Sequence, residues 1–138
     1  MRKVVLICAV ALLVVGLIGP AASAATRHGT RTGVATLVGT DVERHGSCSG
    51  SSRWDLELDT EGTRIEVDFE VDTAQAGTTW HVTLKHNGTA FFTGNRVTDH
   101  EGEFDVERST PNASGTDYYR ARATQAASGE VCVGKASI

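Results

Sequence analysis

The sequence has few cysteines, few prolines and only one long hydrophobic run. Three of its 138 residues are cysteine and two are proline, and no low-complexity tract or internal repeat occurs. A structural zinc site needs about four ligands at short spacing. Beyond the hydrophobic run only two cysteines remain, far apart, so the sequence predicts no metal site and no cofactor.

The single hydrophobic run lies at the amino terminus and has the features of an export signal. Arg2 and Lys3 precede an uncharged apolar run over residues 4–18, and Ala22-Ser23-Ala24 offers a small-x-small cleavage pattern. A run of 15 residues is shorter than the roughly 20 that span a bilayer. We therefore predict a signal peptide over residues 1–24, removed together with Cys8. The expected product is secreted and extracellular, free or associated with the envelope, with no membrane contact after cleavage.

Removal of 24 residues leaves 114, which is the size of one domain. This part carries 17 acidic and 11 basic side chains, because two of the 13 basic residues are Arg2 and Lys3. The chain is mildly acidic, and no nucleic-acid partner is expected. Its two cysteines, Cys48 and Cys132, are predicted to form a disulfide, since an even pair in an exported protein is typical of one.

Residues 64–72 alternate between charged and apolar side chains at all nine positions. A period of two places Ile65, Val67, Phe69 and Val71 on one face, the pattern of a sheet that is buried on one side only. Similar short segments recur at roughly ten-residue spacing with turn residues between them, and no helical period appears. The sequence therefore predicts an all-β antiparallel sandwich of about 7–8 strands. We expect a flexible arm over residues 25–33 and one domain over residues 34–138.

The predicted strands divide into two sheets, with a weaker strand at 34–43 and a polar loop at 45–52. One sheet is expected to hold 53–59, 64–72 and 103–108, and the other 79–86, 89–93, 118–124 and 130–137. A polar connection is expected over 94–102 and a loop over 110–116. Asn87-Gly88 marks a hairpin, and the pattern leaves open which of Phe91 and Phe92 is buried.

The turn before residue 64 sets the expected strand register. With Glu61-Gly62 as a two-residue turn, Leu58 would lie opposite Ile65. The outward pairs would then include two ion pairs, Asp59 with Arg64 and Arg53 with Glu70, on either side of four carboxylates.

Several of these features resemble an immunoglobulin-like or fibronectin type III-like domain. They are the strand at 65–71, the strand led by Trp80, the Asn87-Gly88 hairpin, Phe104-x-Val106 and Asp117-x-Tyr119-x-Ala121. The resemblance implies that Tyr119 forms a tyrosine corner. Ala121 stands where antibody domains have a cysteine, so the expected disulfide is a different one. The chain also resembles small exported actinobacterial proteins, a likeness that carries no activity.

The outward residues of the two predicted sheets differ in charge. The first sheet presents mostly carboxylates, which are expected to act as solubilising charge, with a divalent cation site as the alternative. The second presents a basic and aromatic set: His81, Lys85, Tyr118, Arg120 and Arg122. These five are the candidate binding residues, with a solvated strand face as the competing interpretation.

Two functions agree with this pattern, and neither is catalytic. The first is a secreted binding module whose basic-aromatic face takes an anionic cell-envelope polymer or a protein partner. The alternative is a secreted inhibitor or effector that acts through a surface loop, 110–116 or 46–52. No catalytic residues are predicted, because the five histidines lie in the arm, in loops, beside a turn or on an outward face, with no nucleophile and cleft between them.

Overall fold

A computed structural model describes residues 40–138 of the chain. The predicted signal peptide, the predicted arm and the first part of the weak strand, residues 34–39, lie outside the described residues. Within residues 40–138 there is no helix that is long and apolar enough to cross a membrane.

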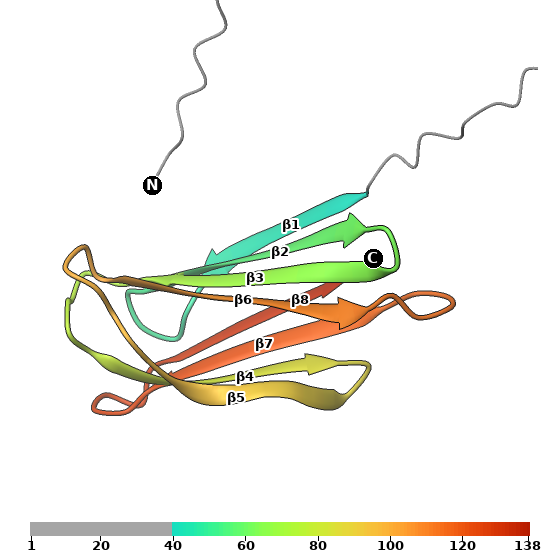
Figure 1. Ribbon diagram of the computed structural model, residues 1–138. Helices are drawn as coiled ribbons and strands as arrows, with labels where there is room; N and C mark the ends of the chain where they lie inside the picture. Colours follow the sequence, from blue (N-terminus) through green and yellow to red (C-terminus); the bar gives the residue numbers. More distant parts are fainter. Residues whose placement is uncertain (1–39) are drawn as a thin grey trace, which may run out of the picture. The chain divides into compact units, whose positions relative to one another are not determined.

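The described chain folds into eight antiparallel strands arranged as two packed sheets, which confirms the predicted β-sandwich (Figure 1). The strands are β1 (Asp41–Ser47), β2 (Arg53–Glu61), β3 (Arg64–Asp72), β4 (Thr79–His86), β5 (Thr89–Val97), β6 (Glu103–Pro111), β7 (Tyr118–Gln125) and β8 (Val131–Ser137). Sheet A has the order β1-β2-β3-β6, and sheet B has the order β5-β4-β7-β8. The predicted division of strands between the sheets is correct, and β1 joins sheet A.

The core forms where the alternating apolar side chains of the two sheets meet. Every second residue of β3 is buried, from Ile65 to Val71, while the charged residues between them remain partly or fully exposed. The same alternation in β4 and β7 buries the residues that face sheet A. The core comprises Leu56, Leu58, Ile65, Val67, Phe69, Val71, Trp80, Val82, Leu84, Phe104, Val106, Tyr119, Ala121, Ala123 and Cys132.

Four predicted strand ends are wrong by two residues or more, including that of β2, which continues to Glu61. β1 runs through His45 to Ser47, where the sequence predicts a loop, because residues 41–47 pair along their whole length with 53–59 of β2. Partner-strand pairing can override weak local propensity. β5 continues to Val97, into the predicted connection, and β6 continues to Pro111, into the predicted 110–116 loop.

The predicted register of β2 and β3 is wrong by two residues. Leu58 lies opposite Val67 rather than Ile65, and the turn residues are Gly62 and Thr63. Gly62 has a φ of 63°, and of the two hairpin turns that match strand twist, type II′ has glycine at its first central position. A shift of two residues keeps every side chain on its predicted face. It changes the neighbours, however, and neither predicted ion pair forms.

A β-bulge explains why neither Phe91 nor Phe92 is the single buried phenylalanine of β5. The register of β4 and β5 shifts between Leu84 and Lys85, so that Leu84 pairs with Phe92 and Lys85 with Ala90. Phe91 is thereby left as the extra residue. Both phenylalanines are partly buried against the core, and the Phe91 ring meets Tyr119 edge-on at 6.2 Å between centroids.

The predicted disulfide between Cys48 and Cys132 is present, with sulfur atoms 2.00 Å apart. The two cysteines lie in different surroundings. Cys48 follows β1, but Cys132 lies in β8 and is fully buried. The bond therefore ties the end of a sheet A strand to the edge strand of sheet B.

Gly102, in the turn before β6, is expected to tolerate no side chain. Its φ is 92°, and a Cβ atom there would lie 2.3 Å from the carbonyl oxygen of Thr73. Gly102→Ala is expected to lower the free energy of unfolding by about 2–4 kcal/mol, combining left-handed strain with steric overlap. Gly115→Ala is the matched control, since Gly115 has a φ of 99° with nothing within 4 Å of the added carbon. Equal losses in urea unfolding would show that the contact with Thr73 has no effect.

Candidate functional site

The outward face of sheet B carries a row of basic side chains across three strands. In β7 the alternating residues Tyr119 and Ala121 are buried, while Arg120 between them is exposed. The strand register places Arg120 opposite Lys85 of β4 on one side and opposite Lys135 of β8 on the other. Like charges directly opposite one another destabilise a sheet. The row therefore lowers the stability of sheet B unless an anion binds beside it.

A hollow of about 420 Å³ opens beside this row. Its charged lining residues are Arg44, Lys85, Arg120 and Lys135, and its lining includes no carboxylate. The ring of Tyr118 also lines it and is 63% exposed, one of two large apolar residues of the described chain with such exposure. Within residues 40–138 the side-chain ion pairs within 4 Å both involve histidine, so none of the four cations is paired. The hollow is thus electropositive and has an amphipathic ring at its margin.

The structure brings three of the five predicted binding residues together in this hollow. Lys85, Tyr118 and Arg120 line it. Arg122 lies two residues further along β7, opposite Thr83, and does not line the hollow. His81 is further still, and its Nδ1 lies 3.0 Å from the side-chain oxygen of Asn95.

The sequence analysis missed two charged lining residues, Arg44 and Lys135. The alternation of β8, in which Cys132 and Gly134 are buried, places Lys135 on the outward face with Arg120 and could have identified it. Arg44 had no comparable signal, because the predicted strand ended at residue 43. It reaches the hollow because β1 and β8 lie side by side at the edge of the sandwich.

The two loops of the alternative function are held by hydrogen bonds to the sandwich. The backbone N–H of Ser49 donates to the Val131 carbonyl at 2.8 Å, and that of Ser52 donates to the Glu130 carboxylate at 2.9 Å. In the second loop the N–H of Asn112 donates to the Thr63 carbonyl at 2.9 Å. The 46–52 loop borders hollows of about 320 and 150 Å³.

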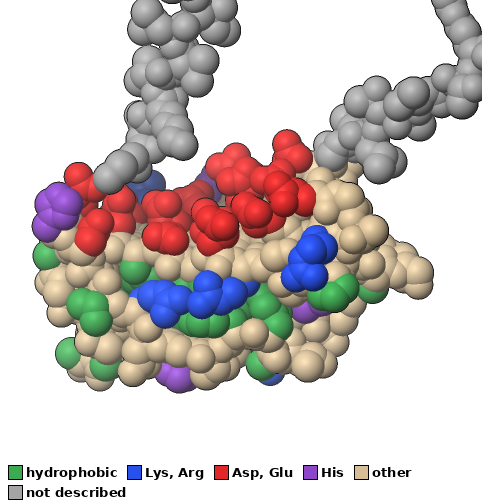
Figure 2. Space-filling model, viewed as in Figure 1, with side chains coloured by type: hydrophobic (Ala, Val, Ile, Leu, Met, Phe, Trp, Pro, Cys, Tyr) green, Lys and Arg blue, Asp and Glu red, His purple; other side chains and the backbone are tan. Residues whose placement is uncertain are grey.

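Sheet A presents the opposite charge (Figure 2), with aspartate and glutamate side chains gathered over its outward face. One cross-strand row consists of four carboxylates: Glu43, Glu57, Asp68 and Glu107. Burial, followed by the charges of neighbouring carboxylates, raises the pKa of Asp68. A hydrogen bond with Asp41 and partial burial raise the pKa of Asp59 to about 6. A folded-state pKa above the unfolded value means that this face destabilises the protein increasingly as pH rises through that range.

A polar network lies at the start of β7, around the buried side chain of Asp117, which is 1% exposed. One carboxylate oxygen lies 2.5 Å from Nε2 of His86 and accepts from Nδ2 of Asn87 at 3.0 Å, and the other accepts from the Ala113 N–H at 3.0 Å. Burial acts to raise the pKa of Asp117, but these hydrogen bonds outweigh it and hold the pKa below its usual value.

The same network fixes the end of the sandwich near the hollow. The ring of His86 stacks on Tyr119 at 4.6 Å between centroids, and the Tyr119 hydroxyl shares a 2.6 Å hydrogen bond with Thr110 of β6. Asn87, at a φ of 47°, also accepts from the Tyr118 N–H at 2.9 Å. The network thereby positions Tyr118 beside the hollow.

The comparisons with known proteins add no functional assignment. No protein-family model and no curated protein matches this chain.

Proposed function

We propose that this protein is a secreted, non-catalytic binding module that takes an anionic polymer in the hollow on sheet B. The observation that carries the proposal is the lining of that hollow: four unpaired cations, no carboxylate and an exposed tyrosine. Neighbouring strands are about 4.8 Å apart, so the row from Lys85 to Lys135 spans about 10 Å. Such a row suits a ligand with repeated negative charges, such as an anionic polymer of the cell envelope.

Each lining residue has a role in this proposal. Arg120, at the centre of the row, would bind an anionic group of the polymer through its planar guanidinium. Lys85, Lys135 and Arg44 would contribute charge on three sides. Tyr118 would contact the uncharged backbone of the polymer through its amphipathic ring. The disulfide supports an extracellular location, because such bonds persist in oxidising compartments.

The likeness to immunoglobulin-like and fibronectin type III-like domains is part of the proposal. It is supported by the strand orders β1-β2-β3-β6 and β5-β4-β7-β8 and by the full burial of Trp80 in β4. The hydroxyl of Tyr119 bonds back to Thr110, nine residues upstream, as a tyrosine corner would. Domains of this architecture commonly present binding surfaces, although fold alone does not establish function.

Charge reversal at Arg120 tests the proposal against a matched control. Arg120→Glu and Arg122→Glu change the net charge equally, and both residues are exposed on the outward face of β7, but only Arg120 lines the hollow. With a fluorescent glycerol-phosphate polymer as the probe, we expect Arg120→Glu to weaken binding at least about tenfold, or about 1.4 kcal/mol. Arg122→Glu is expected to weaken it by less than about threefold. Dissociation constants from fluorescence anisotropy measure both.

Salt dependence provides the second measurement. The Debye length, over which charges attract one another, shortens from about 30 Å at 0.01 M salt to about 10 Å at 0.1 M. The affinity for the polymer should therefore fall as the salt concentration rises. Equal effects of the two substitutions would mean that net charge attracts the probe without a site. No binding to the polymer at low salt would exclude this function altogether.

A further inference from the structure

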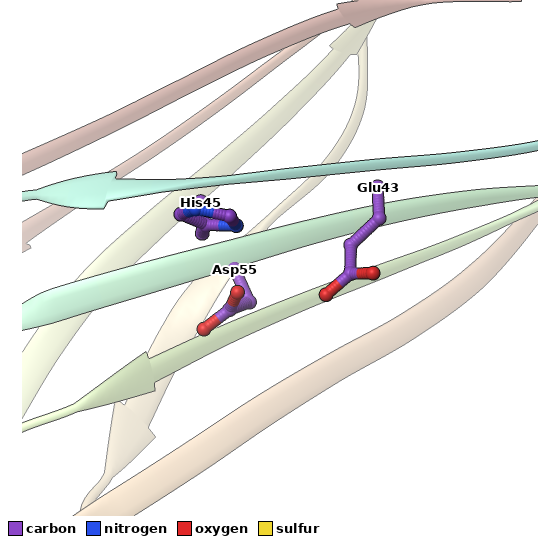
Figure 3. Close-up of side chains that lie close together, drawn as sticks. All are labelled: Glu43, His45 and Asp55. Carbon is purple, nitrogen blue, oxygen red and sulfur yellow. The ribbon is translucent and has the colours of Figure 1, made fainter.

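Three metal-ligating side chains converge on the outward face of sheet A. Glu43 and His45 are two residues apart in β1, and therefore point to the same side of the sheet. The register places Asp55 of β2 directly opposite His45. The ligand atoms of the three side chains all lie within 4.8 Å of one another (Figure 3).

These three side chains differ from the rest of the acidic face in two ways. The set includes an imidazole, and its outward neighbours are carboxylates on one side and the Ser47–Arg53 pair on the other. Within residues 40–138, none of the three side chains forms a hydrogen bond or an ion pair. Their ligand atoms therefore approach one another without an interaction that would hold them in place.

A small hollow beside the three side chains is lined by carboxylates alone. Glu43 and Asp55 line this hollow of about 60 Å³ together with Glu57, Asp68 and Glu70. Asp68 also has the only buried side-chain oxygen or nitrogen of residues 40–138 without a hydrogen-bond partner, its Oδ1. Burying an unsatisfied polar atom is costly. A positive charge bound beside this hollow would offset that cost.

We propose that Glu43, His45 and Asp55 form a binding site for one divalent transition-metal ion of the Zn²⁺ type. Imidazole and carboxylate ligands together suit Zn²⁺ and its neighbours, whereas Ca²⁺ and Mg²⁺ select oxygen ligands alone. Ligands about 2.1 Å from one ion lie about 3 to 4 Å from each other. The side chains therefore need to close by only about 1 Å, which rotamer changes allow because Glu43 and His45 are exposed.

The bound ion would have two effects on the molecule. Its two positive charges would neutralise Glu43 and Asp55 at a corner where carboxylates repel one another. Because its ligands come from both β1 and β2, it would also fasten the edge strand β1 to the sheet. Three protein ligands leave at least one coordination position for water or for a donor group of another molecule.

Isothermal titration of the full chain with ZnCl₂ tests the proposal. Cys8 is replaced by serine, so that no free thiol competes for the metal. We expect saturable one-to-one binding that both His45→Gln and Asp55→Asn weaken at least about tenfold, because loss of even an outer-shell partner of a metal ligand costs about 10- to 100-fold. His81→Gln is the matched control, since His81 is an exposed strand histidine on the other sheet, and it should change the affinity less than twofold.

A parallel titration with CaCl₂ separates a metal site from general attraction to an acidic surface. Binding of Ca²⁺ should be much weaker than that of Zn²⁺ and unaffected by His45→Gln. The proposal is overturned if Zn²⁺ does not saturate, if His45→Gln binds Zn²⁺ as tightly as the parent chain, or if Ca²⁺ binds equally well. Circular dichroism confirms that each variant is folded, and Asp55→Asn provides an independent variant if His45→Gln is not.

Discussion

Reduction of the Cys48–Cys132 disulfide is expected to lower the free energy of unfolding by up to about 4.6 kcal/mol. The two cysteines are 84 residues apart, and in the chain-entropy model the stabilisation grows with the length of the closed loop. The figure is an upper value because residual structure in the reduced unfolded chain lowers it. Few single changes remove as large a share of the 5–15 kcal/mol that folded domains typically have.

Urea unfolding of the oxidised and the reduced protein measures this effect without altering the sequence. The comparison is preferable to double replacement by alanine, because Cys132 is fully buried and its truncation would add a packing loss. A double-alanine variant should therefore be less stable than the reduced protein. If oxidised and reduced proteins unfold at the same urea concentration, the cross-link contributes nothing and the packing of β8 alone holds that edge.

Asp117→Ala is expected to cost about 3–5 kcal/mol. The substitution removes a buried carboxylate that accepts from His86, Asn87 and the Ala113 N–H. A hydrogen bond to a charged group contributes about 1.5–3 kcal/mol, and the sum is reduced because water can reach the partly exposed donors once Asp117 is gone. Asp99→Ala is the matched control, since Asp99 is an exposed aspartate that accepts from the N–H groups of Glu101 and Glu103. Asp99→Ala should lower the free energy of unfolding by about 1 kcal/mol or less. An equal loss for both variants would show that the hydrogen bonds to Asp117 add no more stability than those of an exposed aspartate.

The effect of Asp117→Ala should also depend on pH. The pKa of Asp117 is lower in the folded protein than its ordinary value of 3.8. Its stabilisation is therefore complete above about pH 4 and is lost as pH falls through the folded-state pKa. The difference in stability between the parent and the variant should be constant near neutrality and should narrow in stronger acid. The raised pKa values on sheet A contribute equally to both proteins, so they cancel in this difference.

Much of the fold follows from local alternation. The period of two between Ile65 and Val71 predicts which residues face the core, and the same reasoning divides the strands correctly between two sheets. This information survives even an error in register: the shift of two residues between β2 and β3 changed every cross-strand neighbour but no face. The disulfide was predicted from the cysteine count, because only two cysteines remain beyond the hydrophobic run.

The candidate sites depend on contacts between segments distant in the sequence. Arg44 joins the basic hollow because β1 lies beside β8. His45 meets Asp55 because β1 extends further than its composition predicts.

The sequence by itself determined the faces of the strands, and only the tertiary structure decided which side chains became neighbours. The physical reason is that pleating is a property of each strand, so side-chain direction follows from local periodicity. The pairing of strands instead depends on the packing of two sheets and on turn geometry. Alternation places Lys85, Arg120 and Lys135 on outward faces, but only the register aligns them opposite one another. The same holds for the cluster of Glu43, His45 and Asp55.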